Sequence, residues 1–372
     1  MKLFTCQSCG QVLYFENTTC THCQHRLGYL AEEETMSALE PDDETGGGTT
    51  WRALGARDGT RRYRFCRNAQ HDVCNWLVPA DSAEGFCLAC RHNRIVPNLA
   101  EPGNIEHWRA LEVAKHRLFY SLLRLRLPLH TRQEDPEHGL VFDFKEDMAG
   151  GTKVMTGHDD GVITIALKEA DDVRREEMRK HLGEVYRTLL GHFRHEIAHH
   201  YWDLLVERGA NGELEAFRDL FGDERQDYQQ ALDTYYANGA PADWQENYVS
   251  AYASAHPWED FAETWTHYLH IVDTLEMAGA FGISVHPAEV PDDGSLSTNI
   301  DFDPYTAETI GAIVDAWLPL SFAVNSLNRS MGLADLYPFV LSPHAVEKLG
   351  FIHRLVRGQP LAVETPLPPG PA

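Results

Sequence analysis

The segment His195-Glu196-Ile197-Ala198-His199 carries two histidines four positions apart, with a glutamate directly after the first. On a helix these histidines lie one turn apart on the same face, so both imidazole rings can reach one metal ion. Glu196 points in a neighbouring direction, from which it can take a proton from a water that the metal activates. The spacing therefore predicts a zinc site for hydrolysis, on a helix whose far side, with Ile197 and Tyr201, packs into the core.

A third zinc ligand must come from another part of the chain. Metzincins need glycine seven and histidine ten residues after the first histidine. These positions hold Trp202 and Leu205, so that class is excluded. Gluzincins instead take a glutamate from a later helix, and the segment 257–263 predicts one, because Pro257 suits a first helical turn. Glu259 and Glu263 share a face of this helix, so one can bind zinc while the other orients a histidine ligand.

Other side chains near these segments are alternatives. Asp260 is the rival third ligand, and His192 shares a face with His195 and can line the site. Further histidines more often complete hydrogen bonds in a fold than bind a metal. Those expected to be satisfied or exposed, and not ligands, are His200, His267 and His270.

All eight cysteines lie within the first 90 residues. Disulfides would be unusual in a reducing cytoplasm, so the spacing indicates metal binding. Two Cys-x-x-Cys pairs supply four thiolates, which close a tetrahedral shell and suit structural zinc. This first quartet consists of Cys6, Cys9, Cys20 and Cys23. Segment 12–15 between the pairs is the expected strand of a small zinc ribbon.

The second quartet has looser spacing. It consists of Cys66, Cys74, Cys87 and Cys90, of which only the last two form a Cys-x-x-Cys pair. His71 is a possible substitute ligand, and free buried thiols are the alternative to a second zinc site. Neither cysteine unit can bury enough core to fold alone without a metal. We therefore expect one catalytic zinc and one or two structural zincs.

Composition and charge narrow the class of protein. The chain has 372 residues, 43% of them hydrophobic and 24% charged, which is typical of a globular protein. Its net charge is −24, of which only −2 falls in residues 1–100. The rest of the chain is therefore strongly acidic, which argues against a dedicated nucleic-acid binder. The first residues lack the apolar region of a secretory signal. The apolar stretch 310–327 contains Asp315, Pro319 and Asn325, which favours a buried helix over a membrane span, and we expect a cytoplasmic protein.

The remaining patterns predict an α+β fold. A helix begins at Asn104, the expected cap, and its apolar stripe starts at Trp108. Short strand patterns follow at 140–144 and 161–167, and helices dominate from Asp171 onward, with a long helical run at 183–207 around the histidines. We predict N-terminal zinc-ribbon units followed by a mostly helical zincin-like domain with a small sheet.

Five regions follow from these patterns. They are a zinc ribbon at 1–30, an acidic and glycine-rich linker at 31–50, a second four-cysteine unit at 51–98, the zincin-like domain at 99–357, and a disordered proline-rich tail at 358–372. Five arginines cluster beside Cys66. They form either a solvated basic face, docked on the acidic body, or a contact for nucleic acid or an acidic partner. They are Arg57, Arg61, Arg62, Arg64 and Arg67.

The segment 259–263 resembles the Glu-Phe-Phe-Ala-Glu segment of gluzincins of the anthrax lethal factor type, and its acid spacing resembles thermolysin-type gluzincins. This resemblance implies that Glu259 is the zinc ligand and Glu263 its support. It also places an oxyanion-stabilising tyrosine seven residues before the ligand, at Tyr252. Tyr248 is the alternative.

Most of the chain resembles bacterial zinc-binding metallopeptidases that carry an N-terminal zinc-ribbon domain. The resemblance rests on the cysteine pairs of residues 6–23 and on the blocks at 74–80, 156–158, 186–196 and 256–263. It implies a zincin-like fold and peptidase activity, and it supplies no substrate.

These inferences combine into one main hypothesis. A zinc-dependent metallopeptidase would use Glu196 as general base on a peptide or protein substrate, which pairs with strand 161–167 as the edge of the sheet. The alternative is a non-catalytic adaptor, whose ribbons bind a protein or nucleic acid and whose zincin-like body is regulatory. A protein partner of the ribbons fits either hypothesis, and we expect no membrane partner under either. A nucleic-acid partner is not expected for the peptidase.

Overall fold

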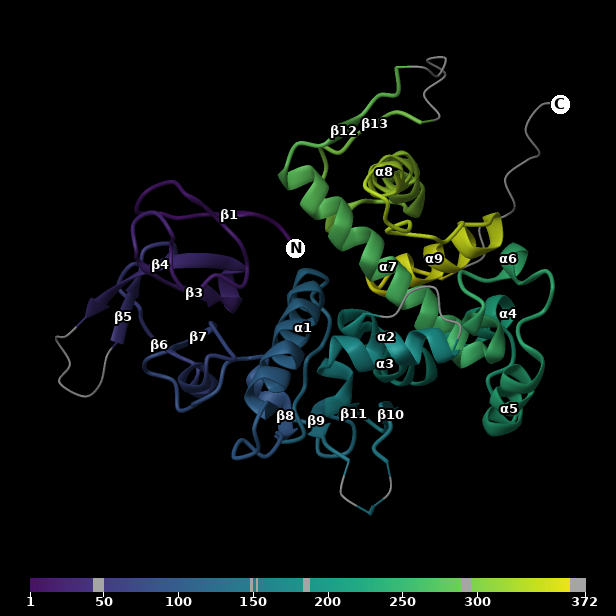
Figure 1. Ribbon diagram of the computed structural model, residues 1–372, viewed down its shortest axis with the longest axis horizontal. Coiled ribbons are helices and arrows are strands. Elements are labelled where there is room, and N and C mark those ends of the chain that lie inside the picture. The colour runs from purple at the N-terminus through teal and green to yellow at the C-terminus, as the bar shows by residue number, and fades with distance from the viewer. Residues whose placement is uncertain (43–49, 148–149, 152, 183–187, 289–295, 362–372) are drawn as a thin grey trace.

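The computed structural model describes residues 1–42, 50–147, 150–151, 153–182, 188–288 and 296–361. The chain is a mixed α+β protein, with a strand-rich zinc-ribbon region followed by a mostly helical body that contains small sheets. Figure 1 shows the strand-rich region on one side of helix α1 (Asn104–Arg124) and the helical body on the other. The predicted fold class is confirmed.

A two-stranded antiparallel sheet of β1 (Phe4–Thr5) and β2 (Val12–Leu13) carries the Cys6/Cys9 pair in the loop between its strands, and the Cys20/Cys23 pair follows β2. The predicted strand at 12–15 therefore ends two residues early. An antiparallel five-stranded sheet follows, in chain order. Its strands are β3 (Arg26–Leu30), β4 (Thr35–Asp42), β5 (Thr50–Ala53), β6 (Arg62–Phe65) and β7 (Leu77–Pro79).

The linker predicted at 31–50 is wrong for residues 31–42. A short turn at Ala31–Glu33 leads directly into β4, whose Met36 and Ala38 are fully buried. Because β4 pairs with β3 on one side and β5 on the other, the two cysteine units share one sheet and are not separated by a tether. The glycines at 46–48 lie outside the described residues.

The acidic residues around β4 suggested a linker because the arginines with which they form ion pairs lie far away in the sequence. Arg61 contacts Glu32 at 2.7 Å, and Arg62 pairs with Asp42. Arg64 donates hydrogen bonds to the backbone carbonyl groups of the segment after β7. Three of the five clustered arginines therefore form ion pairs or hydrogen bonds within the ribbon region.

A four-stranded sheet lies at the base of the body, in the order β10-β11-β9-β8. Its strands are β8 (Asn93–Ile95), β9 (Val141–Lys145), β10 (Gly157–Asp159) and β11 (Val162–Ala166). β8, β9 and β11 are parallel, whereas β10 runs antiparallel to β11. The strand predicted at 161–167 is thus internal, and the prediction that it is the sheet edge is wrong.

The two-residue turn between β10 and β11 explains this difference. Asp160 and Gly161 both have positive φ, of 44° and 76°, as a tight hairpin turn requires. A Cβ at Gly161 would also lie 2.7 Å from the carbonyl oxygen of His138. The turn therefore folds the short β10 back along β11 and makes β10 the outer strand.

Helices build the rest of the body. α1 begins at Asn104 as predicted, but Gly103 is its cap, and the Asn104 side chain instead bonds to Asn98 and Glu146. After α2 (Asp172–Leu182), Thr188 caps α3 (Leu189–Trp202), so the helical run predicted from residue 183 begins at 189 within the described residues. A π-helical turn (Asp203–Glu207) extends α3. The helices that follow are α4 (Glu213–Phe221), α5 (Tyr228–Asn238), α6 (Trp244–Asn247), α7 (Pro257–Ala280), α8 (Ile310–Ser330) and α9 (Pro343–Leu355).

The core of the body forms where α3 packs against α7, and Figure 1 shows the two helices side by side. Phe193, Ile197 and Tyr201 of α3 are fully buried, and the ring of Tyr201 stacks on Trp265 of α7 at 5.2 Å. This apolar contact between α3 and α7 fixes the angle and register of the two helices that carry the predicted metal ligands.

Helix α8 is long and apolar enough to cross a membrane by length and composition alone, and 33% of its most apolar window is buried. One face, with Trp317 and Leu320, packs into the body, whereas Phe322 and Leu327 are 61% and 65% exposed. The predicted buried helix is therefore buried on one face only. Most of the predicted proline-rich tail lies outside the described residues.

Candidate metal centres

The predicted catalytic ligands converge at the crossing of α3 and α7. His195 and His199 lie on α3, and Glu259 lies in the first turn of α7, which begins with Pro257 as predicted. One potential ligand atom from each side chain lies within 4.8 Å of the other two. His256 caps α7 by accepting a hydrogen bond from the backbone N–H of Trp258, which fixes this first turn.

The donor set fits zinc. The Nε2 atom of His195 lies 3.0 Å from Oε2 of Glu259, and Nε2 of His199 lies 3.8 Å from Oε1. Adjacent nitrogen and oxygen ligands of a tetrahedral zinc ion lie about 3.3 Å apart, so these spacings match one shell. Glu259 is 1% exposed, and its pKa is lowered to about 2, because the two histidines outweigh the effect of burial. These two imidazoles and the ionised carboxylate would hold a zinc ion through three protein ligands, as hydrolytic zinc sites do.

Glu263 supports the first histidine. Its Oε1 lies 2.9 Å from Nδ1 of His195, and its Oε2 accepts a hydrogen bond of 2.6 Å from Ser250. Burial disfavours the ionised form, but the His195 and Ser250 hydrogen bonds lower the pKa of Glu263 overall. An ionised Glu263 accepts the hydrogen bond from Nδ1 of His195, which leaves Nε2, on the side of Glu259, as the nitrogen that would bind a metal.

Tyr228, at the start of α5, is a site residue that the sequence analysis missed. Its hydroxyl donates a hydrogen bond of 2.6 Å to Oε1 of Glu259. Burial raises the pKa of Tyr228, and the nearby charges of Glu259 and Glu196 raise it further. No sequence signal marks this tyrosine, because it lies 31 positions before its partner and on a separate helix.

The structure distinguishes the two candidate tyrosines. The ring of Tyr252 lies 6.0 Å from the ring of His195, and burial together with Glu259 raises its pKa. Tyr248 instead lies beneath the ammonium group of Lys348, which is 4.4 Å from its ring centre. Tyr252 is therefore the one that borders the candidate metal ligands.

Asp260 is directed away from the other candidate ligands. Its Oδ2 forms an ion pair of 2.6 Å with Lys348 of α9, and both side chains are buried. Burial raises the pKa of Asp260 to about 7. One residue further along a helix turns the side chain by about 100°, which points Asp260 into the core. The rival ligand assignment is wrong.

The other histidines have different partners. His192 pairs with Glu169 at 3.3 Å, and His267 shares a hydrogen bond of 2.6 Å with the hydroxyl of Tyr337. His270 contacts Arg194, and His200 is buried in the core. A further histidine, His158 of β10, stacks on the ring of His199 at 6.2 Å. The sequence analysis did not predict that His158 lies beside His199.

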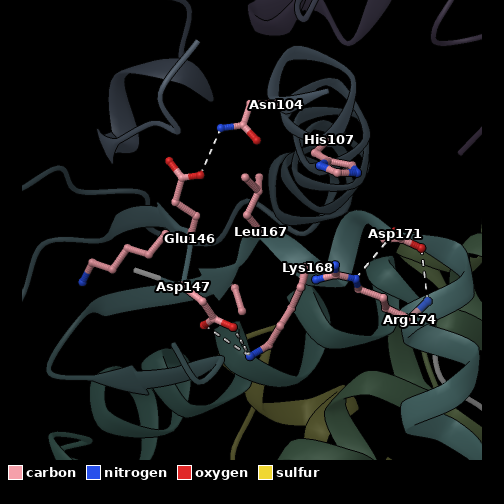
Figure 2. A pocket seen from close by; sticks show the side chains of 10 residues that line it. Asn104, His107, Glu146, Asp147, Leu167, Lys168, Asp171 and Arg174 are labelled. Atoms are coloured by element: carbon pink, nitrogen blue, oxygen red, sulfur yellow. Dashed lines mark hydrogen bonds and ion pairs between the residues drawn. The ribbon is translucent and has the colours of Figure 1, made fainter. Parts of the chain in front are cut away.

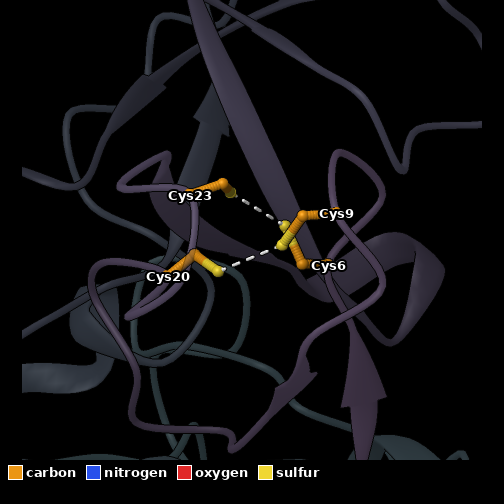
Figure 3. A group of neighbouring side chains, drawn as sticks. All are labelled: Cys6, Cys9, Cys20 and Cys23. Atoms are coloured by element: carbon orange, nitrogen blue, oxygen red, sulfur yellow. Dashed lines mark hydrogen bonds between the residues drawn. The ribbon is translucent and has the colours of Figure 1, made fainter.

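Both cysteine quartets form compact groups. In the first, shown in Figure 3, Cys6 lies 3.6 Å from Cys23, and Cys9 lies 3.6 Å from Cys20. Sulfur ligands of a tetrahedral zinc ion lie about 3.8 Å apart, so this group fits zinc. The four sulfurs of the second quartet also lie close together, and none of the eight cysteines forms a disulfide. His71 packs on Trp108 and is not among the donors grouped with the second quartet.

A separate hollow of about 230 Å³ lies between α1 and the sheet, and Figure 2 shows the side chains that line it. Its charges are paired locally. Lys168 contacts Asp147 at 3.4 Å, and Arg174 contacts Asp171 at 3.9 Å. None of its lining residues belongs to a group of potential metal ligands found among the described residues.

Comparison with known proteins defines the class. Residues 104–355 match the family described as "putative zinc-binding metallo-peptidase", and residues 3–101 match a zinc-ribbon domain. The chain belongs to this zinc-binding metallopeptidase family. It is 40% identical over 356 residues to the uncharacterized proteins Rv2568c of Mycobacterium tuberculosis and Mb2598c of Mycobacterium bovis, which covers 96% of this chain and 95% of each relative. No solved structure matches the chain significantly.

Proposed function

We propose that the protein is a zinc-dependent peptidase of the gluzincin type, with His195, His199 and Glu259 as the zinc ligands. The convergence of these three side chains within one coordination shell is the observation that carries the proposal. The Glu263 carboxylate behind His195 supports it, because zinc-binding histidines usually donate their second N–H to such a group.

Zinc, when bound, supplies Lewis-acid activation of a water molecule and of the peptide carbonyl group. Glu196 takes the proton from the attacking water and delivers it to the leaving amine. Tyr252 donates a hydrogen bond to the oxygen that becomes negative as the carbonyl carbon is attacked. Tyr228 holds Glu259, and Glu263 holds His195, so two of the ligands are fixed before substrate arrives.

The substrate backbone pairs with β10 in this proposal. β10 is the outer strand of its sheet, and its His158 stacks on the ligand His199. An extended peptide added to this edge would therefore lie beside the metal ligands. The acidic body would favour basic residues in that peptide through long-range attraction.

The test is substitution of the general base. Glu196→Gln should keep zinc and fold as the parent does, and should lose hydrolysis of a peptide library by at least a hundredfold. Glu215→Gln, on an exposed position of α4, is the matched control and should retain activity. Cleavage by Glu196→Gln at the parental rate would show that Glu196 is not the base.

A further inference from the structure

The second cysteine quartet lies against the first helix of the body. His116 of α1 is 4% exposed, and its Nε2 lies 3.4 Å from Sγ of Cys74 and 3.8 Å from Sγ of Cys90. The cysteines belong to the zinc-ribbon match at 3–101, whereas His116 belongs to the metallopeptidase match at 104–355. This cluster therefore draws donor atoms from both regions.

The His116 ring is oriented as a metal ligand would be. Its Nδ1 lies 2.6 Å from the backbone carbonyl oxygen of Glu112. A carbonyl oxygen only accepts hydrogen bonds, so Nδ1 carries a hydrogen, and Nε2 is the ring nitrogen that faces the two sulfurs. The ring of Trp76, 5.0 Å away, packs against His116 and limits its rotation.

The neighbouring carboxylate is committed to other partners. Oε2 of Glu112 lies 3.8 Å from Sγ of Cys90, but it is also 2.8 Å from Nζ of Lys115. Its Oε1 accepts a hydrogen bond from the indole of Trp108 at 3.0 Å. Glu112 and Lys115 are both fully buried, so withdrawing the carboxylate to a metal would break a buried ion pair. His116 can approach a metal without such a loss.

We propose that His116 is a reserve ligand of the second cysteine centre, which holds zinc through three thiolates and the His116 imidazole when Cys74 is lost. Nitrogen and sulfur ligands of a tetrahedral zinc ion lie about 3.5 Å apart, close to the 3.8 Å between Nε2 of His116 and Sγ of Cys90, which the proposed set retains. The 3.4 Å to Sγ of Cys74 places the ring beside the position that the lost thiolate would leave. Exchanging a thiolate for a neutral imidazole also lowers the negative charge next to the buried Glu112. Among the described residues, no histidine or carboxylate joins the group of the first quartet.

The first centre therefore provides a matched control. Zinc per chain is measured on the full-length protein, purified without chelator and then dialysed against a weak chelator. Cys20→Ala should lose one zinc equivalent relative to the parent, whereas Cys74→Ala should retain the parental amount. The double variant Cys74→Ala/His116→Ala should lose one equivalent, and His116→Ala alone should lose none.

A second measurement reports the ligands directly. With ¹¹³Cd in place of zinc, the resonance of the second centre should move in Cys74→Ala to the range of three sulfurs and one nitrogen. Equal zinc loss in Cys74→Ala and Cys20→Ala, retention of zinc by the double variant, or a parent that holds no metal at this centre would each overturn the proposal. Peptidase activity is not a readout, so the result is independent of the proposed function.

Discussion

The hydrogen bond between His195 and Glu263 allows the proposed zinc site to be tested without touching a ligand. In Glu263→Gln, the amide oxygen can still accept from Nδ1 of His195, and the amide N–H₂ can donate to Ser250. The geometry of 2.9 Å and 2.6 Å is therefore retained while the negative charge is removed. Glu263→Ala removes the hydrogen bond as well.

The expected magnitudes follow from the strength of these bonds. A hydrogen bond to an ionised group contributes about 1.5–3 kcal/mol, and one between neutral groups about 0.5–1.5 kcal/mol. Glu263→Gln should therefore weaken zinc binding by roughly 1.4 kcal/mol, which is about tenfold. Glu263→Ala should approach the roughly hundredfold loss typical when the group behind a zinc-bound histidine is removed.

The assay is competition for zinc with a chromophoric chelator, at neutral pH, on protein whose cysteine centres are already loaded. Ser250→Ala is the graded control. This variant leaves the Glu263 carboxylate in place and should lower the zinc affinity less than Glu263→Gln does. Zinc affinities of Glu263→Ala and the parent that agree within twofold would refute the claim that this carboxylate fixes His195.

Three further predictions concern catalysis and stability. Tyr252→Phe should lower kcat about a hundredfold with zinc content unchanged, whereas Tyr248→Phe should leave kcat unaltered, and the reverse order would contradict the assignment. His267 is buried, which lowers its pKa to about 4, so the unfolded chain takes up the proton first as pH falls. The free energy of unfolding should therefore fall by about 3 kcal/mol between pH 7 and pH 4 on account of this group, and urea titrations of His267→Gln should show a shallower loss over that window. Lys348→Met would leave the buried Asp260 carboxyl group without its partner and should destabilise the fold by about 3 kcal/mol, and an unchanged Tm would contradict this.

Local sequence patterns predicted the parts of the site that lie on single helices. The i, i+4 spacing places His195 and His199 on one face of α3, and Pro257 marks the first turn of α7. Both relations involve residues within one or two helical turns, so the local sequence determines them. In the structure α3 and α7 cross so that Glu259 lies beside both histidines, as a shared metal site needs, and Asp260 is turned away.

Contacts between distant segments were not predictable in the same way. The acidic run after residue 31 indicated a linker because its arginine partners follow some 20 to 30 positions later. The prediction that 161–167 is the sheet edge is wrong because one short hairpin turn, at Asp160 and Gly161, decides which strand lies outermost. The hydroxyl of Tyr228 and the imidazole of His116 reach their partners only through tertiary packing.

The central claim is that the histidines of α3 hold a zinc ion separate from both cysteine centres. The most direct test is zinc per chain on protein purified without chelator or added metal, compared between the parent and His199→Ala. We predict that the variant contains one zinc equivalent fewer than the parent and retains its fold. Equal zinc content in the two proteins, unchanged after zinc is added, would mean that this helix holds no metal and would contradict the proposed peptidase mechanism.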